Sequence, residues 1–347
     1  MPLHRRLPGA SLQGHLTAHL TALPVHVDSA PGKRGEWEIA RIPVKPNSTE
    51  FHTVRGLPLA VHRWGDPANA KILFHHGFLD HGRSFAPIAQ KLVDTWEVLA
   101  LDARGHGESA WVGEGGYYHF ADFWHDLDVI LQSYGPVHLV GHSMGGMISA
   151  VVAAIRPQQV LSLALLDGMG PPEMPIAAWP DRLTSWLDAL QVPGYTGDLS
   201  ERRASRRPMP NVEEAAKRLQ KANPRLPAEM ALRLAQTNTE MTSEGVVWRH
   251  DPLHKTPSSR PFRTDEAMTL WARLQMPVLS IYADHSEWLP PDLAQRHAQV
   301  PHLHAGVLAN ASHNLHHEQP DLLAEMLRSW FLAPGKTLPV GLRPGEP

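Results

Sequence analysis

The chain has 347 residues, of which 42% are hydrophobic and 19% are charged, a composition typical of a globular protein. A formal net charge of −3 gives no electrostatic reason to expect binding to nucleic acid or to an anionic membrane. The chain has no cysteine, which excludes disulfides, thiolate metal sites and cysteine nucleophiles and leads us to expect a cytoplasmic protein. No apolar run approaches the ~18 residues of a membrane span.

The two ends of the chain are predicted to lie outside the folded core. Residues 1–27 contain no acidic residue and lack the apolar stretch of a secretory signal, and we interpret residues 1–35 as a disordered extension. Residues 334–347 are rich in proline and glycine, which predicts a loose C-terminal tail.

Six short apolar segments alternate with segments of helical pattern between these ends. The segments are residues 72–74, 98–101, 137–140, 161–166, 278–282 and 304–308. This alternation predicts an α/β fold with a mostly parallel sheet flanked by helices, built from residues 36–170 and 270–333. Because ligands of such sheets bind beyond the carboxyl ends of the strands, we expect the functional residues there.

Residues 171–269 interrupt the alternation, and we expect them to form a helical cap over the carboxyl edge of the sheet. Apolar spacing predicts helices near residues 176–190 and 228–236, and Asn211 with Glu214 resembles a capping box that opens another helix. The arginines between 202 and 207 are interpreted as a solvated face. Trp179 and Trp186 are candidates for contacting an apolar or aromatic substrate, or else for building the core of the cap.

The segment Gly141–Gly145 reads Gly-His-Ser-Met-Gly and lies between a predicted strand and a predicted helix. This pattern places a serine on a sharp, strained turn, where side chains at the two glycine positions would clash. The sequence therefore predicts Ser143 as a nucleophile. The backbone amides of Met144 and of Phe78, which follows the first parallel strand, are the candidate donors of an oxyanion hole.

A serine nucleophile needs a base that takes its proton, and histidine titrates in the useful range. His313 follows the last predicted parallel strand and is our candidate for this base. His316 and His317 lie close by in the sequence and are its rivals.

Four segments of the chain resemble, in order and spacing, those of the α/β-hydrolase superfamily over residues 50–333. They are His76–Phe78, Asp102–Gly107, Gly141–Gly145 and Ser312–His313. Within that superfamily, the chain is similar to the serine-hydrolase-like branch. The segments that carry this second resemblance are Asp167–Pro171, Asn223–Arg225, Trp248–Pro252 and His313–Pro320. The resemblance implies hydrolysis by an activated serine, and it does not imply a particular substrate.

The catalytic acid departs from the pattern of the superfamily. The usual position, counted from Ala283, is occupied by Ser286, which has no carboxylate. We favour Asp167, at the end of the strand that follows the nucleophile segment, and leave Asp284 and Glu287 open as alternatives. All three acids preserve the chain order serine, acid, histidine.

These observations favour a serine hydrolase that cleaves an ester or related acyl bond of a small, apolar substrate through an acyl-enzyme. We expect no cofactor and no metal, because the 23 histidines form no complete ligand set at a defined spacing. A hydrolase-fold binding protein with weakened catalysis, and a perhydrolase or carbon–carbon hydrolase with the same triad, remain alternatives. The oligomeric state does not follow from the sequence.

Overall fold

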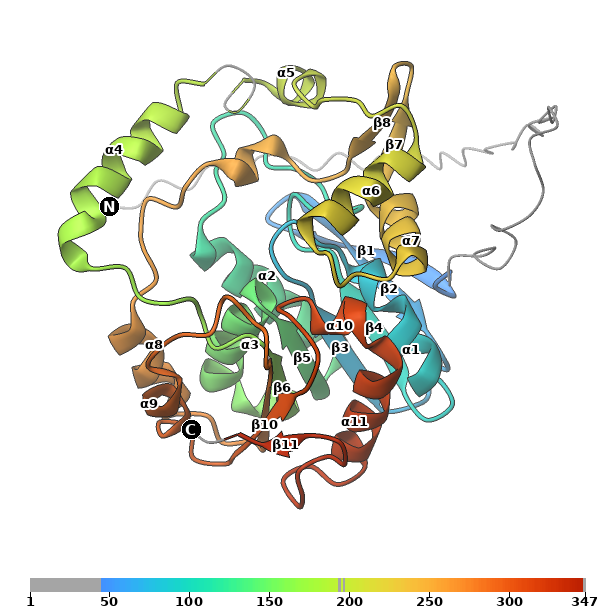
Figure 1. Cartoon of the computed structure of the whole chain (residues 1–347), viewed down its shortest axis with the longest axis vertical. Coiled ribbons are helices and arrows are strands. Elements are labelled where there is room, and N and C mark those ends of the chain that lie inside the picture. The colour runs from blue at the N-terminus through green and yellow to red at the C-terminus, as the bar shows by residue number, and fades with distance from the viewer. Residues whose placement is uncertain (1–44, 193–194, 196, 346–347) are drawn as a thin grey trace, which may run out of the picture. The chain divides into compact units, whose positions relative to one another are not determined.

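The computed structural model describes residues 45–192, 195 and 197–345, so the expected N-terminal extension, residues 1–35, lies outside the described residues. Within the described part, nine strands form one sheet in the order β1-β2-β4-β3-β5-β6-β9-β10-β11 (Figure 1). The strands are β1 (Ser48–Val54), β2 (Leu57–Trp64), β3 (Lys71–His75), β4 (Glu97–Leu101), β5 (Val137–His142), β6 (Val160–Leu166), β9 (Val278–Ala283), β10 (Leu303–Leu308) and β11 (Arg343–Pro344).

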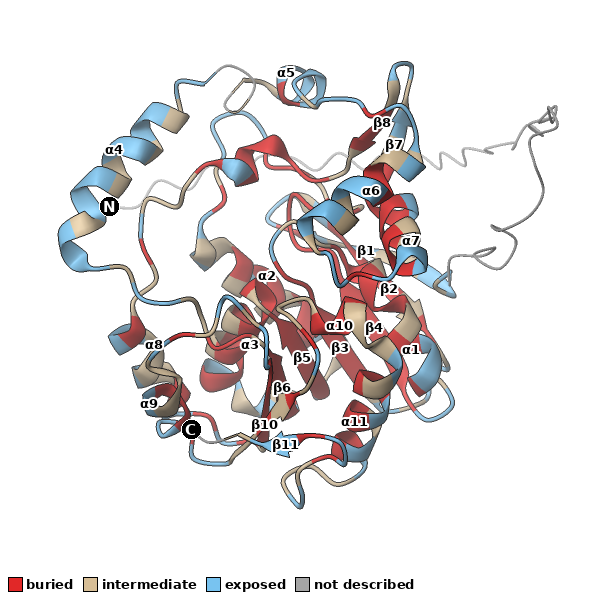
Figure 2. Cartoon of the chain, in the orientation of Figure 1, coloured by how far each residue is buried: buried red, intermediate tan, exposed pale blue. Residues whose placement is uncertain are grey.

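The six strands from β4 to β10 in this order are parallel, and they are the six strands expected from the sequence. Every residue of β4, β5 and β9 is buried, as the red strands of Figure 2 show. A strand covered by helices on both faces needs apolar residues at successive positions, which is why a continuous apolar run identified it. The predicted α/β fold with a mostly parallel sheet is thus confirmed.

Two antiparallel additions at the edges of the sheet were not expected. β1 and β2 form a hairpin whose turn, Arg55-Gly56, has positive φ at both residues, 48° and 82°. Such turns favour Asn-Gly, so an arginine at the first position gave no turn signal. β11 pairs with β10 through Arg343 and Pro344, and the expectation of a loose tail is wrong for these residues.

Helices cover both faces of the central sheet. They are α1 (Ala86–Leu92), α2 (Phe120–Tyr134), α3 (Met144–Ile155), α8 (Thr264–Trp271), α9 (Leu293–His297), α10 (Leu315–Glu318) and α11 (Pro320–Leu332). Successive side chains of a strand point to opposite faces. In β3, Leu73 joins a core with α2 and α3, whereas Ile72 and Phe74 join a second core with α1 and α11. No helix in the described ranges has the length and apolar character needed to cross a membrane.

The insertion at residues 171–269 contains the three expected helices, a further short helix and an unexpected hairpin. Its elements are α4 (Trp179–Ala189), α5 (Leu199–Ala204), α6 (Val212–Ala222), α7 (Ala228–Asn238), β7 (Thr239–Thr242) and β8 (Gly245–Trp248). Asn211 caps α6 by accepting the amide of Glu214 at 2.9 Å, as the sequence suggested. Side chains from α6, α7 and β8, among them Met230, Leu234 and Val246, form a small core of their own.

The arginines between residues 202 and 207 form the expected solvated face only in part, since Arg203 and Arg207 are exposed but Arg202 is not. Arg202 is buried, and its guanidinium donates to the carboxylate of Asp251 and to the backbone oxygen of Val112. Asp251 also accepts the hydroxyl of Tyr118 at 2.8 Å. Arg202 and Asp251 both belong to the insertion, and their hydrogen bonds to Val112 and Tyr118 fasten it to the loop that follows β4.

Removal of the buried cation should destabilise the whole fold. Arg202→Met leaves the Asp251 carboxylate buried without its cation, which typically costs about 3–5 kcal/mol. Urea denaturation followed by circular dichroism measures this loss of unfolding free energy. Arg207→Met removes an exposed cation from the same segment and should change stability by less than about 0.5 kcal/mol. Equal losses in the two variants would contradict a structural role for the Arg202–Asp251 pair.

Candidate active site

Ser143 lies between β5 and α3 on a sharply strained turn. Its φ of 50° and ψ of −118° are rarely adopted by a residue with a side chain. A Cβ atom at Gly141 would lie 2.5 Å from the Gly145 oxygen, and one at Gly145 would lie 2.2 Å from the His75 oxygen. Both glycines are therefore required by the close approach of backbone segments, as the motif predicted.

His313 lies in the loop after β10, with its ring between the serine and an acid. Its Nε2 lies 2.9 Å from Ser143 Oγ, and its Nδ1 lies 2.7 Å from Asp167 Oδ2. The backbone oxygen of His313 is 2.9 Å from His142 Nε2, so the residue before the serine holds the loop of the histidine. The structure thus brings together Ser143, His313 and Asp167.

Asp167 emerges directly from the end of β6 with a positive φ of 47°. Its amide donates to the backbone oxygen of Ile281 in β9 at 2.7 Å. Ser286, which occupies the usual position of the acid, donates its hydroxyl to Asp167 Oδ2. The departure from the family pattern therefore has a structural explanation, since Ser286 supports the carboxylate that reaches His313. No local sequence pattern indicates this contact, because 119 residues separate the two side chains.

The two alternative acids lie elsewhere. Asp284 accepts the amides of Asn310 and Ala311 at 3.1 and 3.2 Å, and Arg343 lies 3.1 Å away. Burial alone would raise the pKa of Asp284, but the two amide hydrogen bonds and the nearby charges outweigh it and lower the pKa. Asp284 thus fixes the loop after β10. Glu287 is exposed, and no hydrogen bond joins it to His313 in the described part of the chain.

Phe78 and Met144, whose amides are the candidate oxyanion donors, line the same cavity as Ser143. Met144 is the first residue of α3, where backbone N–H groups lack an intrahelical partner. In the described part of the chain, neither amide donates to a protein acceptor. Both residues line the cavity that contains Ser143, and their role as oxyanion donors stays a prediction.

This cavity, the nucleophile cavity, has a volume of about 410 Å³, within the range of small-molecule sites. Its lining residues include Ser143, Asp167, His313 and Met147. Trp288 also lines it, half exposed, with its ring centroid 5.9 Å from that of His313. Sequence reasoning missed Trp288, because it belongs to neither a motif nor a periodic segment.

Trp179 and Trp186, the candidates for contacting substrate, do not line the nucleophile cavity. Trp179 donates its indole N–H to the backbone oxygen of Ser259 at 3.0 Å. The ring of Trp186 packs edge-on against Tyr117, with centroids 6.0 Å apart. Both tryptophans therefore attach α4 to neighbouring loops, which is close to the alternative structural interpretation.

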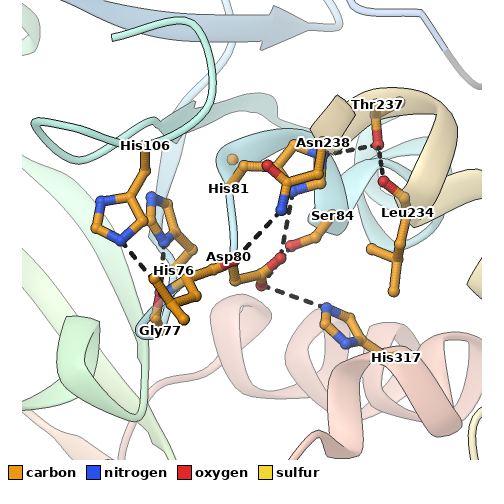
Figure 3. Close-up of polar contacts among 12 residues, drawn as sticks. His76, Gly77, Asp80, His81, Ser84, His106, Leu234, Thr237, Asn238 and His317 are labelled. Atoms are coloured by element: carbon orange, nitrogen blue, oxygen red, sulfur yellow. Dashed lines mark hydrogen bonds and ion pairs between the residues drawn. The ribbon is translucent and has the colours of Figure 1, made fainter. Parts of the chain in front are cut away.

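Asp80 connects the loop of Phe78 with the segment that follows His313. Its Oδ2 accepts the Ser84 hydroxyl at 2.8 Å and lies 3.3 Å from Nε2 of His317 (Figure 3). Nε2 of His316 lies 3.2 Å from the same oxygen. Burial would raise the pKa of Asp80, but the His317 charge and these hydrogen bonds outweigh it and hold the pKa well below its usual value. His316 and His317, the rivals of His313 in the sequence, thus serve to join two loops.

Asp80, His316 and His317 are also the one group in the described ranges that brings three metal-ligating atoms within 4.8 Å of one another. A metal-bound histidine usually donates its second ring N–H to an acceptor. Nδ1 of His316 is buried without a hydrogen-bond partner among the described residues. Nε2 of His316 is hydrogen-bonded to Asp80, whereas Nε2 of His317 makes an ion-pair contact with Asp80 but has no hydrogen bond among the described residues.

Other histidines close hydrogen bonds inside the fold. His76 Nε2 accepts the amide of Ala103 at 2.9 Å, and His106 Nε2 accepts that of Leu79 at 3.2 Å (Figure 3 labels both histidines). Burial lowers the pKa of His76 to about 3 and that of His106 to about 4. Both rings are therefore neutral acceptors at pH 7, which explains part of the histidine-rich composition without a metal.

Comparison with known proteins agrees with this geometry. The sequence model of the alpha/beta hydrolase fold family matches residues 71–320. A serine hydrolase-like protein of Danio rerio is 27% identical over 54% of this chain and 57% of its own length. The lipase LipV of Mycobacterium tuberculosis is 36% identical over 32% of this chain and 42% of its own length. The chain thus spans about half the length of these relatives.

Solved structures of similar fold cover more of the chain. The thioesterase domain from the curacin biosynthetic pathway has a TM-score of 0.72 and 28% identity, covering 81% of this chain and 99% of its own. A hypothetical protein from Pseudomonas aeruginosa PAO1 also has a TM-score of 0.72, with 26% identity over 82% of this chain and 99% of its own. With the family match over residues 71–320 and the parallel sheet, these likenesses show that the chain belongs to the α/β hydrolase fold family.

Proposed function

We propose that this chain is a serine hydrolase that cleaves ester or related acyl bonds of small substrates through an acyl-enzyme. The observation that carries the proposal is the line of hydrogen bonds from Ser143 through His313 to Asp167, at 2.9 and 2.7 Å, along the nucleophile cavity. The names of relatives, a lipase and a thioesterase domain, support an acyl substrate.

In the proposed reaction, Ser143 Oγ attacks a carbonyl carbon while His313 Nε2 takes the hydroxyl proton. Asp167 stabilises the imidazolium that forms and fixes its orientation. The amides of Phe78 and Met144 donate to the developing oxyanion. His313 then protonates the leaving group, and a water molecule hydrolyses the acyl-enzyme by the same route.

The insertion at residues 171–269 serves as a cap in this proposal. Gly170 and Pro171, where it begins, line the nucleophile cavity. The alternative of a binding protein with weakened catalysis was suggested by the absence of an acid at position 286. Because Ser286 instead donates to Asp167, which is hydrogen-bonded to His313, the arrangement favours an enzyme. A perhydrolase or a carbon–carbon hydrolase would use the same serine, histidine and acid. Product analysis with hydrogen peroxide or with a β-diketone as substrate distinguishes these two activities from ester hydrolysis.

The nucleophile assignment is tested by Ser143→Ala. The substitution should abolish labelling by a fluorophosphonate probe and lower kcat by about 10⁴–10⁶ on a 4-nitrophenyl ester, because the covalent route is lost. Ser133→Ala, an exposed serine on α2, is the matched control and should keep both labelling and activity. Labelling that persists in Ser143→Ala would show that another residue is the nucleophile.

The acid assignment is tested by three amide substitutions. Asp167→Asn should lower kcat by at least about 10³, because the amide preserves the shape but no longer stabilises the imidazolium. Asp284→Asn and Glu287→Gln are the matched controls, and each should lose far less. Steady-state kinetics and circular dichroism of all three variants give the answer. If Asp284→Asn is inactive and Asp167→Asn is active, the acid follows β9 instead of β6.

Trp288 should set the preference for acyl chain length in place of Trp179 and Trp186. A hydrophobic wall discriminates by only about 1–3 kcal/mol per methylene, so the wild type should show a graded preference among 4-nitrophenyl esters of C2 to C10 acids. Trp288→Ala should move the optimum of kcat/KM to another chain length. Trp179→Ala is the control and should leave the optimum in place. An unchanged optimum in Trp288→Ala would exclude its ring from the acyl site.

A further inference from the structure

A second cavity, the aromatic cavity, adjoins the nucleophile cavity. It has a volume of about 540 Å³ and is also lined by Phe78 and Met144. These two residues, whose amides are the proposed oxyanion donors, thus line both cavities. If the carbonyl of a substrate were held at those amides, the parts of the substrate on its two sides could enter the two cavities.

The two cavities differ in charge. Arg182 and Lys255 line the aromatic cavity, and no aspartate or glutamate does. The nucleophile cavity is lined instead by Asp80 and Asp167 and has no lysine or arginine. An anionic group would therefore be repelled from the nucleophile cavity and attracted to the aromatic one.

Arg182 is held in place without an acidic partner. Its Nε donates to the backbone oxygen of Ser258 at 2.7 Å, while Trp179 in the same helix donates to Ser259. In the described ranges, neither Arg182 nor Lys255 takes part in an ion pair, whereas Arg202 and other arginines of the insertion do. The terminal nitrogens of Arg182 thus keep their capacity to donate to a ligand, from a guanidinium that is already oriented.

The remainder of the aromatic cavity is lined mainly by apolar and aromatic side chains. They include Tyr117, Tyr118, Phe120, Phe123 and Leu253. The hydroxyl of Tyr117 lies 2.6 Å from Thr256 Oγ1 and donates to the Pro257 oxygen at 2.9 Å, which leaves its ring as part of the wall. Such a wall suits an aliphatic or aromatic arm, with the charge at one end of it.

We infer that the substrate of this hydrolase carries a carboxylate or a similar anionic group at the end of an apolar arm, which lies in the aromatic cavity with Arg182 and Lys255 at the anion. The inference rests on the proposed function and adds a class of substrate to it. Arg182 and Lys255 are specificity residues in this arrangement, and they take no part in the chemical step.

Two pairs of isosteric substrates test the inference, because a primary amide has the shape of a carboxylate without its charge. The acyl-side pair is the 4-nitrophenyl monoester of suberic acid and its ω-carboxamide. The alcohol-side pair is 4-carboxybenzyl butyrate and 4-carbamoylbenzyl butyrate. In wild-type protein, we expect kcat/KM to be about tenfold higher for the acid than for the amide in one pair, which identifies the arm that enters the cavity. A ratio below twofold in both pairs overturns the inference.

Variants test whether the preference for the acid over the amide depends on Arg182 and Lys255. In Arg182→Gln/Lys255→Gln, the acid-to-amide ratio should fall by about tenfold, towards unity. Arg207→Gln removes one positive charge from an exposed position of the insertion and should leave the ratio unchanged. A ratio that persists in the folded double variant places the anion elsewhere. Raising the ionic strength of wild-type assays should also lower the ratio, which provides a test without any substitution.

Failure of this inference is distinguishable from failure of the proposed function. If both members of a pair are hydrolysed equally and Ser143→Ala abolishes hydrolysis, the serine hydrolase stands and the anionic substrate class is wrong. If the wild type hydrolyses none of the four esters and no fluorophosphonate labels it, the proposed function fails, and the inference fails with it.

Discussion

The proposed chemistry depends on the hydrogen bond between His313 Nδ1 and Asp167, because this contact directs the other ring nitrogen towards Ser143. The register of the sheet makes it possible. His142 pairs with Leu166 across β5 and β6, so Ser143 and Asp167 leave adjacent strands at the same level. Both have a positive φ, a conformation that costs about 1–3 kcal/mol per residue and persists only where the surrounding structure enforces it. The buried parallel strands on either side supply that enforcement.

The same register explains why the acid can follow β6. Leu166 pairs with Ile281 in β9, so the end of β6 lies beside the end of the strand after which the family usually places its acid. A carboxylate at position 286 would face Asp167 closely, and two such groups sharing one site raise the pKa of one of them. Ser286 instead donates its hydroxyl to Asp167. An acid at the end of β6, Asp167, is therefore compatible with a serine at position 286, after β9.

Local signals in the sequence predicted the six parallel strands, the turn at Ser143 and the position of His313, because each is encoded within a few consecutive residues. The hairpin β1–β2 was missed because β1 has only one buried residue and the turn begins with an arginine. Contacts between distant segments gave no local signal. The Ser286–Asp167 bond, the burial of Arg202 against Asp251 and the position of Trp288 beside His313 all depend on the folded sheet. Residue type alone could not decide whether the tryptophans of α4 contact substrate or serve the fold, and in the structure they attach the helix to neighbouring loops.

The insertion has two parts that relate differently to the nucleophile. The part with its own core is bonded to the loop of Phe78, since His81 Nε2 lies 2.7 Å from Thr237 Oγ1, and Asn238 donates to the Leu79 oxygen at 3.2 Å (Figure 3). A change in α7 would therefore disturb a proposed oxyanion donor. α4, by contrast, has no fully buried residue in its described length, and it carries Arg182 to the wall of the aromatic cavity. Residues of α4 can thus vary in charge and size at little cost to folding, while the strand ends keep Ser143, His313 and Asp167 in place. Within this architecture, substrate choice can diverge through α4 without altering the groups proposed for the chemical step.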